Sequence, residues 1–248
     1  MTRFAGKAAL VTGVVGGIGA AIAARLAAEG ARVTVTDRPG AAFDAACAAL
    51  GLPGIAADLG RKADVDRLAE SLAHDPPDIL VSAAGGVLGQ IGRPVETVPE
   101  ADWRGIFAAN VDSAFFLAQA FAPAMKARGH GRIVTISSGA GLRPSLTGIQ
   151  AYAAAKHALV GLTRQLALEL GPAGITVNSI APGFVLSNPA TQRQWEAMGP
   201  AGQAALITRI YTRRLGSAAD IAAAATFLAS EEAGWISGQI LSVDGGIA

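Results

Sequence analysis

Cysteine, histidine and the motifs of common hydrolases are scarce or missing in this 248-residue chain. Cys47 is the single cysteine, which excludes an internal disulfide bond and a metal site built from a cysteine cluster, and it fits a reducing, cytoplasmic setting. The three histidines, at positions 74, 130 and 157, lack ligand spacing, and neither His-Glu-x-x-His nor Gly-x-Ser-x-Gly occurs. The sequence therefore predicts no metal site, and metal-dependent and serine hydrolysis both lose support.

Charge is also low and evenly balanced. Charged residues make up 16% of the chain, the formal net charge is +1, and lysines and arginines form no run. A nucleic-acid partner is not expected, because binding to phosphate backbones needs a basic surface. The N-terminus lacks an apolar signal region, and no run of about 18 apolar residues is free of charge and glycine. We expect a soluble cytoplasmic protein with small-molecule partners and no membrane partner.

Short runs rich in valine and isoleucine alternate with longer alanine- and leucine-rich stretches at helical spacing. This alternation is typical of βαβ units and predicts an α/β fold, a doubly wound parallel sheet with helices on both faces in one domain over 1–248. The seven expected strands cover 8–11, 32–36, 54–56, 79–82, 132–137, 176–180 and 240–243. The expected helices cover 18–29, 41–50, 62–73, 103–126, 152–170 and 219–229. Residues 187–214 interrupt the alternation and are interpreted as a substrate lid.

A glycine-rich turn follows the first expected strand. Gly13, Gly17, Ile18 and Gly19 lie between an apolar strand and an amphipathic helix, where glycines permit a tight turn and a close approach of main-chain N–H groups to a pyrophosphate. The spacing is G-x-x-x-G-x-G rather than the G-x-G-x-x-G of two-domain dehydrogenases. The turn predicts a dinucleotide-binding loop.

Asp37 ends the second expected strand, where a carboxylate accepts hydrogen bonds from an adenosine ribose and repels a 2′-phosphate. This favours NAD, although Arg38 beside it can bind that phosphate and keeps NADP as an alternative. Asp58 and Leu59 follow the third expected strand. There the aspartate either hydrogen-bonds the adenine or caps the next helix.

Tyr152 and Lys156 are four residues apart in an expected helix, with Ser137 and Ser138 upstream. Positions i and i+4 share a helix face, so we expect the ammonium near the phenol, where it lowers the pKa of the tyrosine and creates a proton donor and acceptor. A bare Tyr-x-x-x-Lys pair also occurs on ordinary helix surfaces. The other motifs of the chain are what favour a catalytic role for Tyr152 and Lys156.

Together these residues resemble the short-chain dehydrogenase/reductase family over essentially the whole chain, from Lys7 to Gly246. The matching segments are Thr12 to Gly19, Ser82 to Gly85, Asn110, Ser138, Tyr152 with Lys156, Asn178 to Ser187, and Arg214 to Gly246. The chain departs from the family at Ser82 and Ala83, where asparagines are usual, and at Ser187, where threonine is usual. Smaller groups must then brace the loop around Ala83.

The resemblance implies hydride transfer between a nicotinamide cofactor and a secondary alcohol or ketone. It implies that Tyr152 exchanges the hydroxyl proton and that Ser138 hydrogen-bonds the substrate oxygen. Lys156 would lower the pKa of Tyr152 and hold the nicotinamide ribose, and Asn110 would position a water. Ser138 is favoured over Ser137, because adjacent strand residues point to opposite faces. Further cofactor contacts are implied at Ala84, Gly85, Pro182, Gly183, Val185 and Ser187.

Two other functions compete with an NAD-dependent alcohol dehydrogenase. One is an NADPH-dependent 3-oxoacyl reductase, against which Asp37 speaks, and the other is a non-catalytic dinucleotide-binding protein on the same fold. The family resemblance also implies a homotetramer, and the expected helices 103–126 and 152–170 are more apolar than one buried face requires.

The expected lid is rich in arginine. Arg193, Arg209, Arg213 and Arg214 accompany few large apolar residues, a mixture that suits a small polar substrate, such as a sugar-derived hydroxy acid, better than a fatty-acyl chain. The alternative is that these arginines form a solvated helix face, with Arg214 only packing against the neighbouring loop.

Overall fold

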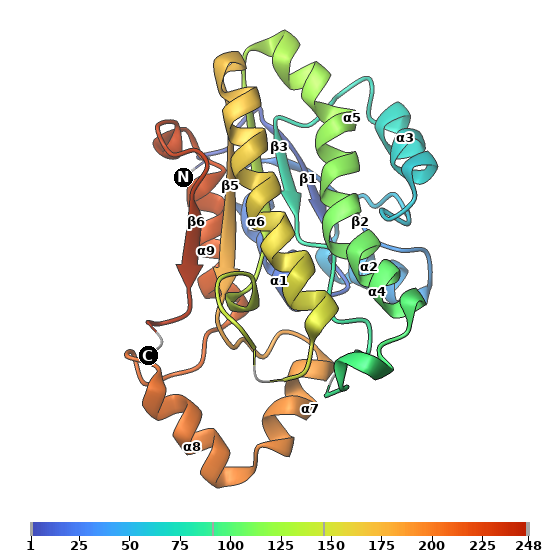
Figure 1. The fold of residues 1–248 in the computed structure, drawn as a ribbon. Coiled ribbons are helices and arrows are strands. Elements are labelled where there is room, and N and C mark those ends of the chain that lie inside the picture. The colour runs from blue at the N-terminus through green and yellow to red at the C-terminus, as the bar shows by residue number, and fades with distance from the viewer. Residues whose placement is uncertain (1, 91, 146, 247–248) are drawn as a thin grey trace.

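The sheet of this protein is parallel throughout and is ordered β2-β1-β3-β4-β5-β6 (Figure 1). The computed structural model describes residues 2–90, 92–145 and 147–246. Its strands are β1 Ala8–Thr12, β2 Arg32–Thr36, β3 Ile79–Ser82, β4 Gly131–Ile136, β5 Ile175–Pro182 and β6 Ile240–Val243. The predicted α/β fold with a doubly wound parallel sheet is confirmed.

Helices cover both faces of this sheet. They are α1 Gly17–Ala28, α2 Ala41–Leu50, α3 Lys62–Ser71, α4 Glu100–Phe107, α5 Ser113–Arg128, α6 Gln150–Leu170, α7 Pro189–Ala197, α8 Gly199–Arg209 and α9 Ala218–Leu228. Successive strand residues point to opposite faces, so Ala9 and Val11 pack in the core under α1 and α9, whereas Leu10 packs under α3, α5 and α6. Expected helix ends differ from the observed ones by at most three residues.

The expected strand at 54–56 is the one element that does not form. Gly54 makes a single bridge to Val35, with one hydrogen bond from Val35 N to Pro53 O and one from Ile55 N to Val35 O. A proline and a glycine in succession weaken a strand, because proline has no N–H donor and glycine has no side chain to pack. The sheet therefore has six strands in the described residues, not seven.

A continuous helix of 29 residues spans 100–128 and includes a π-helical turn at Ala108–Asp112. By length and composition alone this helix is long and apolar enough to cross a membrane, but core helices of soluble proteins meet the same criterion. Leu117, Phe121 and Met125 on α5 are buried against the sheet. The helix is therefore explained as a core element of the fold.

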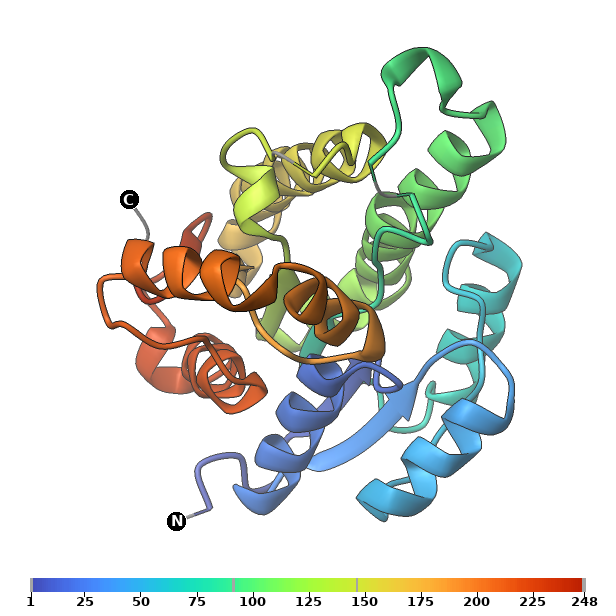
Figure 2. The ribbon, with the colours of Figure 1, turned by 90° about the horizontal axis from the view of Figure 1, so that it is seen from below.

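The carboxyl ends of all six strands meet at one end of the sheet, the lower end in Figure 1. Chain order reverses between β1 and β3, so their following loops diverge and leave a crevice where ligands of such sheets bind. Figure 2 looks onto this end, and α7 and α8 cross in front of it. The fold therefore places the glycine-rich turn and the segment 187–214 together.

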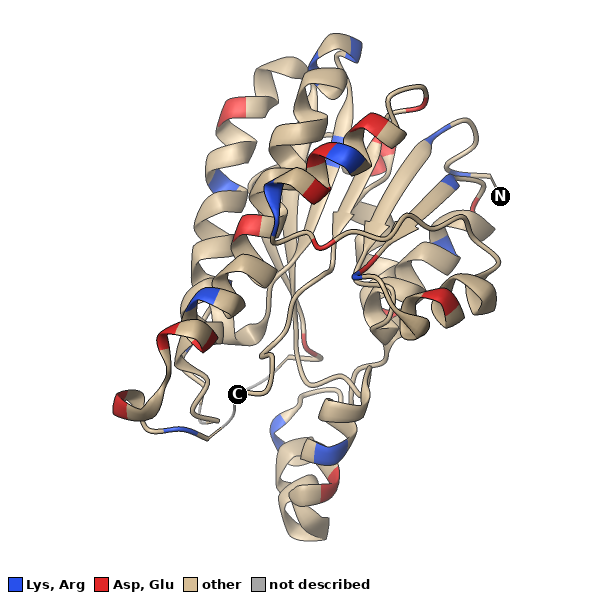
Figure 3. Cartoon of the chain, turned by 90° about the vertical axis from the view of Figure 1, so that its right-hand side faces the viewer, with Lys and Arg blue, Asp and Glu red and all other residues tan. Residues whose placement is uncertain are grey.

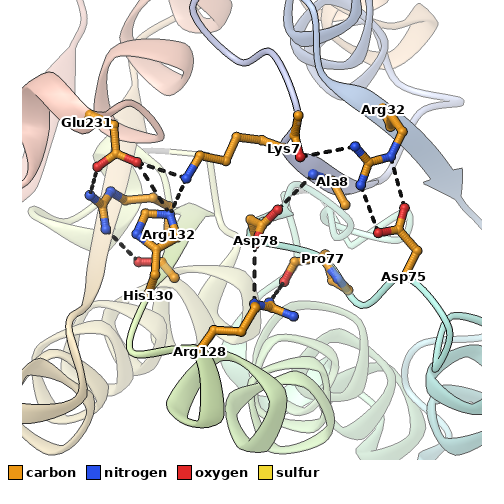
Figure 4. Close-up of polar contacts among 12 residues, drawn as sticks. Lys7, Ala8, Arg32, Asp75, Pro77, Asp78, Arg128, His130, Arg132 and Glu231 are labelled. Atoms are coloured by element: carbon orange, nitrogen blue, oxygen red, sulfur yellow. Dashed lines mark hydrogen bonds and ion pairs between the residues drawn. The ribbon is translucent and has the colours of Figure 1, made fainter.

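The opposite end of the sheet carries a polar network (Figure 4). Glu231 forms ion pairs with Lys7 at 3.0 Å and with Arg132 at 2.8 Å. Lys7 Nζ also lies 3.2 Å from His130 Nε2. Asp78 accepts a hydrogen bond from Ala8 N at 2.9 Å. These contacts join the beginnings of β1 and β4 to the loop after α9, far from the crevice.

Candidate functional site

The glycine-rich turn is shaped by close main-chain contacts. Gly13 has a φ of +74°, and a Cβ there would lie 2.6 Å from the main chain of Ala83 and Ala84. A Cβ on Gly19 would overlap the carbonyl of Gly13. Gly17 N donates to Ser187 O at 2.8 Å, which ties the turn to the base of the expected lid. Only glycine fits at these positions.

The turn leads into α1 without a capping side chain, since Gly16 is the N-cap. Main-chain N–H groups of the first turn, where Gly17, Ile18 and Gly19 lie, are therefore not covered by a side-chain oxygen. The positive end of a helix with such donors is a site for an anion. This observation fits the pyrophosphate of a dinucleotide.

Asp37 lies just past β2 and leans toward the glycine-rich turn. Its carboxylate accepts hydrogen bonds from Val15 N at 3.0 Å and from Arg38 N at 2.8 Å. The carboxylate is thus held at the edge of the crevice, where the sequence places an adenosine ribose. Its contact with Val15 also braces the turn, a role that the sequence did not reveal. The Arg38 side chain is exposed beside it.

Asp58 and Leu59 have separate roles. Leu59 is buried in the core under α3 and α5, while Asp58 accepts a hydrogen bond from Gly60 N at 3.2 Å and its own N–H donates to Asp64. Helix α3 has Arg61 as its N-cap and no side-chain cap. Asp58 therefore closes a turn rather than caps the helix, and its contact with an adenine stays a prediction.

Thr12 supplies the bracing expected from small groups after β3. Its hydroxyl accepts hydrogen bonds from Ala83 N at 3.0 Å and Ala84 N at 2.9 Å, and the threonine is fully buried. Gly85 follows with a φ of +140° and lies against the Asn110 side chain. Thr12 precedes the glycine-rich turn in the sequence, which was the available signal for its role.

Asn110 is buried in the π-helical turn and clamps the same loop. Its side chain accepts from Gly86 N at 3.0 Å and donates to Gly86 O at 3.0 Å and to Ile106 O at 2.8 Å. Both amide hydrogens are therefore engaged with the main chain. The side chain acts as a clamp, and the positioning of a water by Asn110 stays a prediction.

Ser137 and Ser138 point in different directions at the end of β4. Ser137 is buried, and its hydroxyl donates to the carbonyl of Lys156 at 3.2 Å. Ser138 accepts a hydrogen bond from Ala140 N at 3.1 Å, and its hydroxyl faces the Tyr152 phenol closely enough to lower the pKa of that phenol. The hydroxyl that meets the tyrosine is therefore that of Ser138.

Tyr152 and Lys156 project from α6 toward the end of β4. The Lys156 ammonium is buried, donates to Ile136 O at 2.7 Å and lies 5.5 Å from the centroid of the Tyr152 ring. Burial lowers the pKa of Lys156 to about 7. Burial also raises the pKa of Tyr152, and its hydrogen bond to Ser138 lowers that pKa only in part. The expected lowering of the tyrosine pKa by Lys156 is not seen in this structure.

The segment after β5 packs between β6 and the glycine-rich turn. Gly183 N donates to Val243 O at 3.0 Å, and a Cβ on Gly183 would lie 2.7 Å from Asp244. Val185 is buried and bridges to Gly216, and Ser187 meets Gly17 as described above. Pro182, the last residue of β5, begins this segment. All the residues expected there line one path from β5 to the expected lid.

Helices α7 and α8 extend beyond the sheet and bury no residue. Asn188 caps α7 through a capping box with Thr191, and the Phe184 and Trp195 rings lie 6.1 Å apart at its base. Charges of both signs decorate these helices (Figure 3). Arg193, Arg209 and Arg213 are exposed, whereas Arg214 forms a bidentate ion pair with Asp220 at 2.8 Å. Among the described residues no group of three or more histidine, cysteine, aspartate or glutamate side chains could hold a metal ion.

The crevice, the glycine-rich turn and the Ser138, Tyr152 and Lys156 cluster define a dinucleotide-binding oxidoreductase of the doubly wound class. A family model described as enoyl-(acyl carrier protein) reductase matches residues 13–248. The chain belongs to the short-chain dehydrogenase/reductase family, as the sequence resemblance predicted.

Two curated relatives cover nearly the whole chain. Galactitol 2-dehydrogenase (L-tagatose-forming) of Cereibacter sphaeroides is 38% identical over 98% of this chain and 96% of its own length. The 3-oxoacyl-(acyl-carrier-protein) reductase FabG of Escherichia coli (strain K12) is 37% identical over 99% of this chain and 98% of its own length. The relatives thus include both a polyol dehydrogenase and a reductase of acyl carriers.

Solved structures resemble the fold equally well. A candidate NAD(P)-dependent gluconate 5-dehydrogenase of Beutenbergia cavernae, solved with NADP, has a TM-score of 0.88 and 37% identity, and the match covers 99% of this chain and 98% of that one. A 7α-hydroxysteroid dehydrogenase complexed with NADH has a TM-score of 0.88 and 36% identity, with 100% and 96% covered. Both support the fold derived above.

Proposed function

We propose that the protein is an NAD-dependent oxidoreductase that transfers a hydride between the nicotinamide and a secondary alcohol or its ketone. The observation that carries this proposal is the cluster at the end of β4, where the Ser138 hydroxyl faces the Tyr152 phenol and the Lys156 ammonium lies 5.5 Å from the centroid of the Tyr152 ring. A hydroxyl that accepts a proton and a second hydroxyl that orients the substrate oxygen are the groups that this reaction needs. A small polar, sugar-derived or hydroxy-acid substrate suits the exposed polar surface of 187–214.

The expected cofactor class, NAD or NADP, is confirmed by the family and by its cofactor-bound structures. The crevice fits such a group, because Gly13, Gly17 and Gly19 leave no room for side chains where the turn is tightest, and the N-terminus of α1 has no side-chain cap. When bound, the nicotinamide supplies the carbon that accepts or gives the hydride. We assign Gly13, Gly17, Ile18 and Gly19 to the pyrophosphate and Asp37 to the adenosine ribose, which favours NAD.

Proton transfer is the task of the chain's own residues. We propose that Tyr152 takes the substrate hydroxyl proton during oxidation and returns it during reduction, while Ser138 hydrogen-bonds the substrate oxygen. We propose that the protonated form of Lys156 supplies the nearby positive charge that favours the ionised phenol. Because burial alone raises the tyrosine pKa, this charge is needed for Tyr152 to act as a base near neutral pH.

A 3-oxoacyl reductase that uses NADPH is the second candidate, and the similarity to FabG favours it. Asp37 opposes it, since a carboxylate at that position repels a 2′-phosphate. A non-catalytic dinucleotide-binding protein is the third candidate, and detection of a single turnover would exclude it. The measurement that separates all three is NAD- and NADP-linked turnover across secondary alcohols, polyols, sugar acids and hydroxyacyl thioesters.

Replacement of Tyr152 by phenylalanine tests the proposed base. We expect turnover to fall by at least about 10²-fold, the low end for general acid–base catalysis, while NADH binding measured by fluorescence is retained. Tyr211→Phe is the matched control, because Tyr211 is the other tyrosine of the chain and lies at the exposed surface. Near-normal turnover of Tyr152→Phe at saturating substrate would show that another group accepts the proton.

A further inference from the structure

An arginine outside the expected lid lies on the loop that begins at the proposed catalytic serine. Arg143 lies on the loop after β4, and its Nη2 is 3.8 Å from the position of a Cβ on Gly139, the residue next to Ser138. Its side chain is about half exposed, at 49%. Arg143 Nη2 lies 3.9 Å from Asp244 Oδ2, beyond hydrogen-bond distance, and its guanidinium makes no hydrogen bond to the residues that the structure describes. Five donors are therefore present at the edge of the site.

Asp244 brings a carboxylate to the same place from another element. It follows β6 and packs on Gly183, and its Oδ1 accepts a hydrogen bond from Gly246 N at 3.0 Å. Its side chain is largely buried, at 16% exposure, so the carboxylate is held more firmly than the half-exposed guanidinium. The Gly139 loop and the segment after β5 also meet here, since a Cβ on Gly139 would be 3.7 Å from Pro182 O. The two charges thus lie where the loop after Ser138 approaches the segment after β5.

Arg214, one of the four arginines of the expected lid, is not available for a ligand in this way. Arg214 is held by Asp220 through two hydrogen bonds of 2.8 Å. Arg193 lies on the exposed surface of α7, and Arg213 is exposed in the turn after α8. Arg143 lies on the loop that follows the serine, next to Gly139 and Asp244, so specificity is better sought there.

The chemistry of the pair selects its ligand. A guanidinium only donates hydrogen bonds and a carboxylate only accepts them, whereas each hydroxyl of a polyol does both. Neighbouring hydroxyls can therefore accept from Arg143 and donate to Asp244 at once. A substrate carboxylate would gain from Arg143 but would be repelled by Asp244 at a comparable distance, so the two effects largely cancel.

We propose that Arg143 and Asp244 form a specificity pair that binds adjacent hydroxyl groups of a neutral polyol or its keto form. The inference rests on the proposed function, because it places the substrate between this pair and the Ser138 and Tyr152 hydroxyls. It refines the proposed substrate from a small polar molecule, acid or neutral, to a polyhydroxy compound without a carboxylate.

The test compares kcat/KM for galactitol and threitol with kcat/KM for 2-butanol and for gluconate. The proteins are the wild type, Arg143→Gln, Asp244→Asn and the double variant, with Arg25→Gln on α1 as the matched surface control. We expect each single variant to lower kcat/KM for the polyols at least tenfold relative to the control, mainly through KM, and to lower the polyol to 2-butanol ratio. In the double variant, kcat/KM for the polyols should fall by less than the product of the two single-variant factors, because both groups act on one ligand.

Two results would overturn the pair. Unchanged polyol kcat/KM in both variants would show that it does not touch the substrate. Preferred turnover of gluconate that falls in Arg143→Gln and rises in Asp244→Asn would show an anion site instead. Retained NADH fluorescence binding confirms that each variant is folded. Failure of the proposed function gives a different result from failure of the proposed pair alone. In that case the wild type oxidises none of the alcohols with either cofactor, and the proposed pair is rejected as well.

Discussion

The Lys156 ammonium donates a hydrogen bond of 2.7 Å to the carbonyl of Ile136, the last residue of β4. This contact ties the helix that carries Tyr152 to the strand that leads into Ser138. It also fixes the ammonium in a buried position, where one carbonyl replaces the water that it would otherwise bind. The consequence is a lysine whose pKa is lowered to about 7 because the charged form loses hydration.

The buried lysine should reduce stability while it serves the reaction. Its folded pKa is below its unfolded value, so the unfolded state binds more protons between pH 7 and 10.5, and stability rises with pH across that window. Below pH 7 the destabilisation caused by burying the Lys156 ammonium reaches its full value. At roughly 1.4 kcal/mol per tenfold change in proton affinity, it amounts to a few kcal/mol. We therefore expect Lys156→Met to raise the free energy of unfolding at pH 7 by about 1 kcal/mol or more, after loss of the bond to Ile136, and to abolish turnover.

Denaturant unfolding of Lys156→Met and wild type between pH 7 and 10 measures this effect. The difference between them should shrink as pH rises, which a general packing effect would not produce. Lys62→Met is the matched control, because Lys62 is exposed on α3. A Lys156→Met protein that is less stable than wild type at every pH would mean that the hydrogen bond outweighs the cost of burial.

Asp37 should decide the cofactor preference through its charge. Asp37→Asn keeps an oxygen that can accept from Val15 N but removes the repulsion of a 2′-phosphate, whereas Asp37→Ala removes both. We expect the NAD to NADP ratio of kcat/KM to fall about tenfold or more in both variants, which corresponds to about 1.4 kcal/mol. Asp37→Ala should in addition weaken binding of both cofactors. A wild type that already prefers NADPH contradicts this assignment.

Much of the site could be read from the sequence, because its signals are local. The glycine-rich turn, Asp37 and the Tyr152 and Lys156 pair are defined by short spacings within one strand–helix unit, and the fold follows from hydrophobic periodicity. The prediction of a seventh strand was wrong because Pro53 and Gly54 weaken the segment, which leaves only a single bridge to β2 at Gly54. The predicted lowering of the Tyr152 pKa was wrong, because burial raises that pKa and burial is a property of the folded chain that the local sequence does not reveal.

Contacts between distant segments were equally hidden. Thr12 braces Ala83 and Ala84 across 71 and 72 residues, and no local motif announces such a partner. The proximity of Arg143 to Gly139 looks trivial in the sequence, but its approach to Asp244 depends on β4 and β6 lying on either side of β5. Arginine-rich composition therefore pointed to the lid, whereas strand order brings a different arginine, Arg143, to Asp244.

We expect the protein to be a homotetramer with twofold symmetry. Phe115 on α5 is 42% exposed and Leu168 on α6 is 74% exposed, on two helices that pack side by side. Burial of these side chains against a second copy would remove apolar surface from water. Sedimentation equilibrium at micromolar concentration should give four chains, and Phe115→Asp should lower the association state while Phe115→Tyr retains it. A stable wild-type monomer would contradict the expectation.

His130 should make the base of the sheet sensitive to acid. Lys7 has only donors, so the 3.2 Å contact makes His130 Nε2 an acceptor and the imidazole neutral. Burial lowers the pKa of His130 below 6.5, the nearby Lys7 and Arg132 lower it further, and Glu231 and Asp78 oppose them. Because the folded state binds the proton less tightly than the unfolded chain, the stability contributed by neutral His130 is present above pH 6.5 and is lost as pH falls toward the lower folded pKa.

We expect the free energy of unfolding to fall between pH 6.5 and 5 in wild type and to fall less in His130→Gln, as measured by urea denaturation. His74→Gln, at an exposed position, is the control and should follow wild type. Equal pH slopes in His130→Gln and wild type would assign the acid sensitivity to other groups.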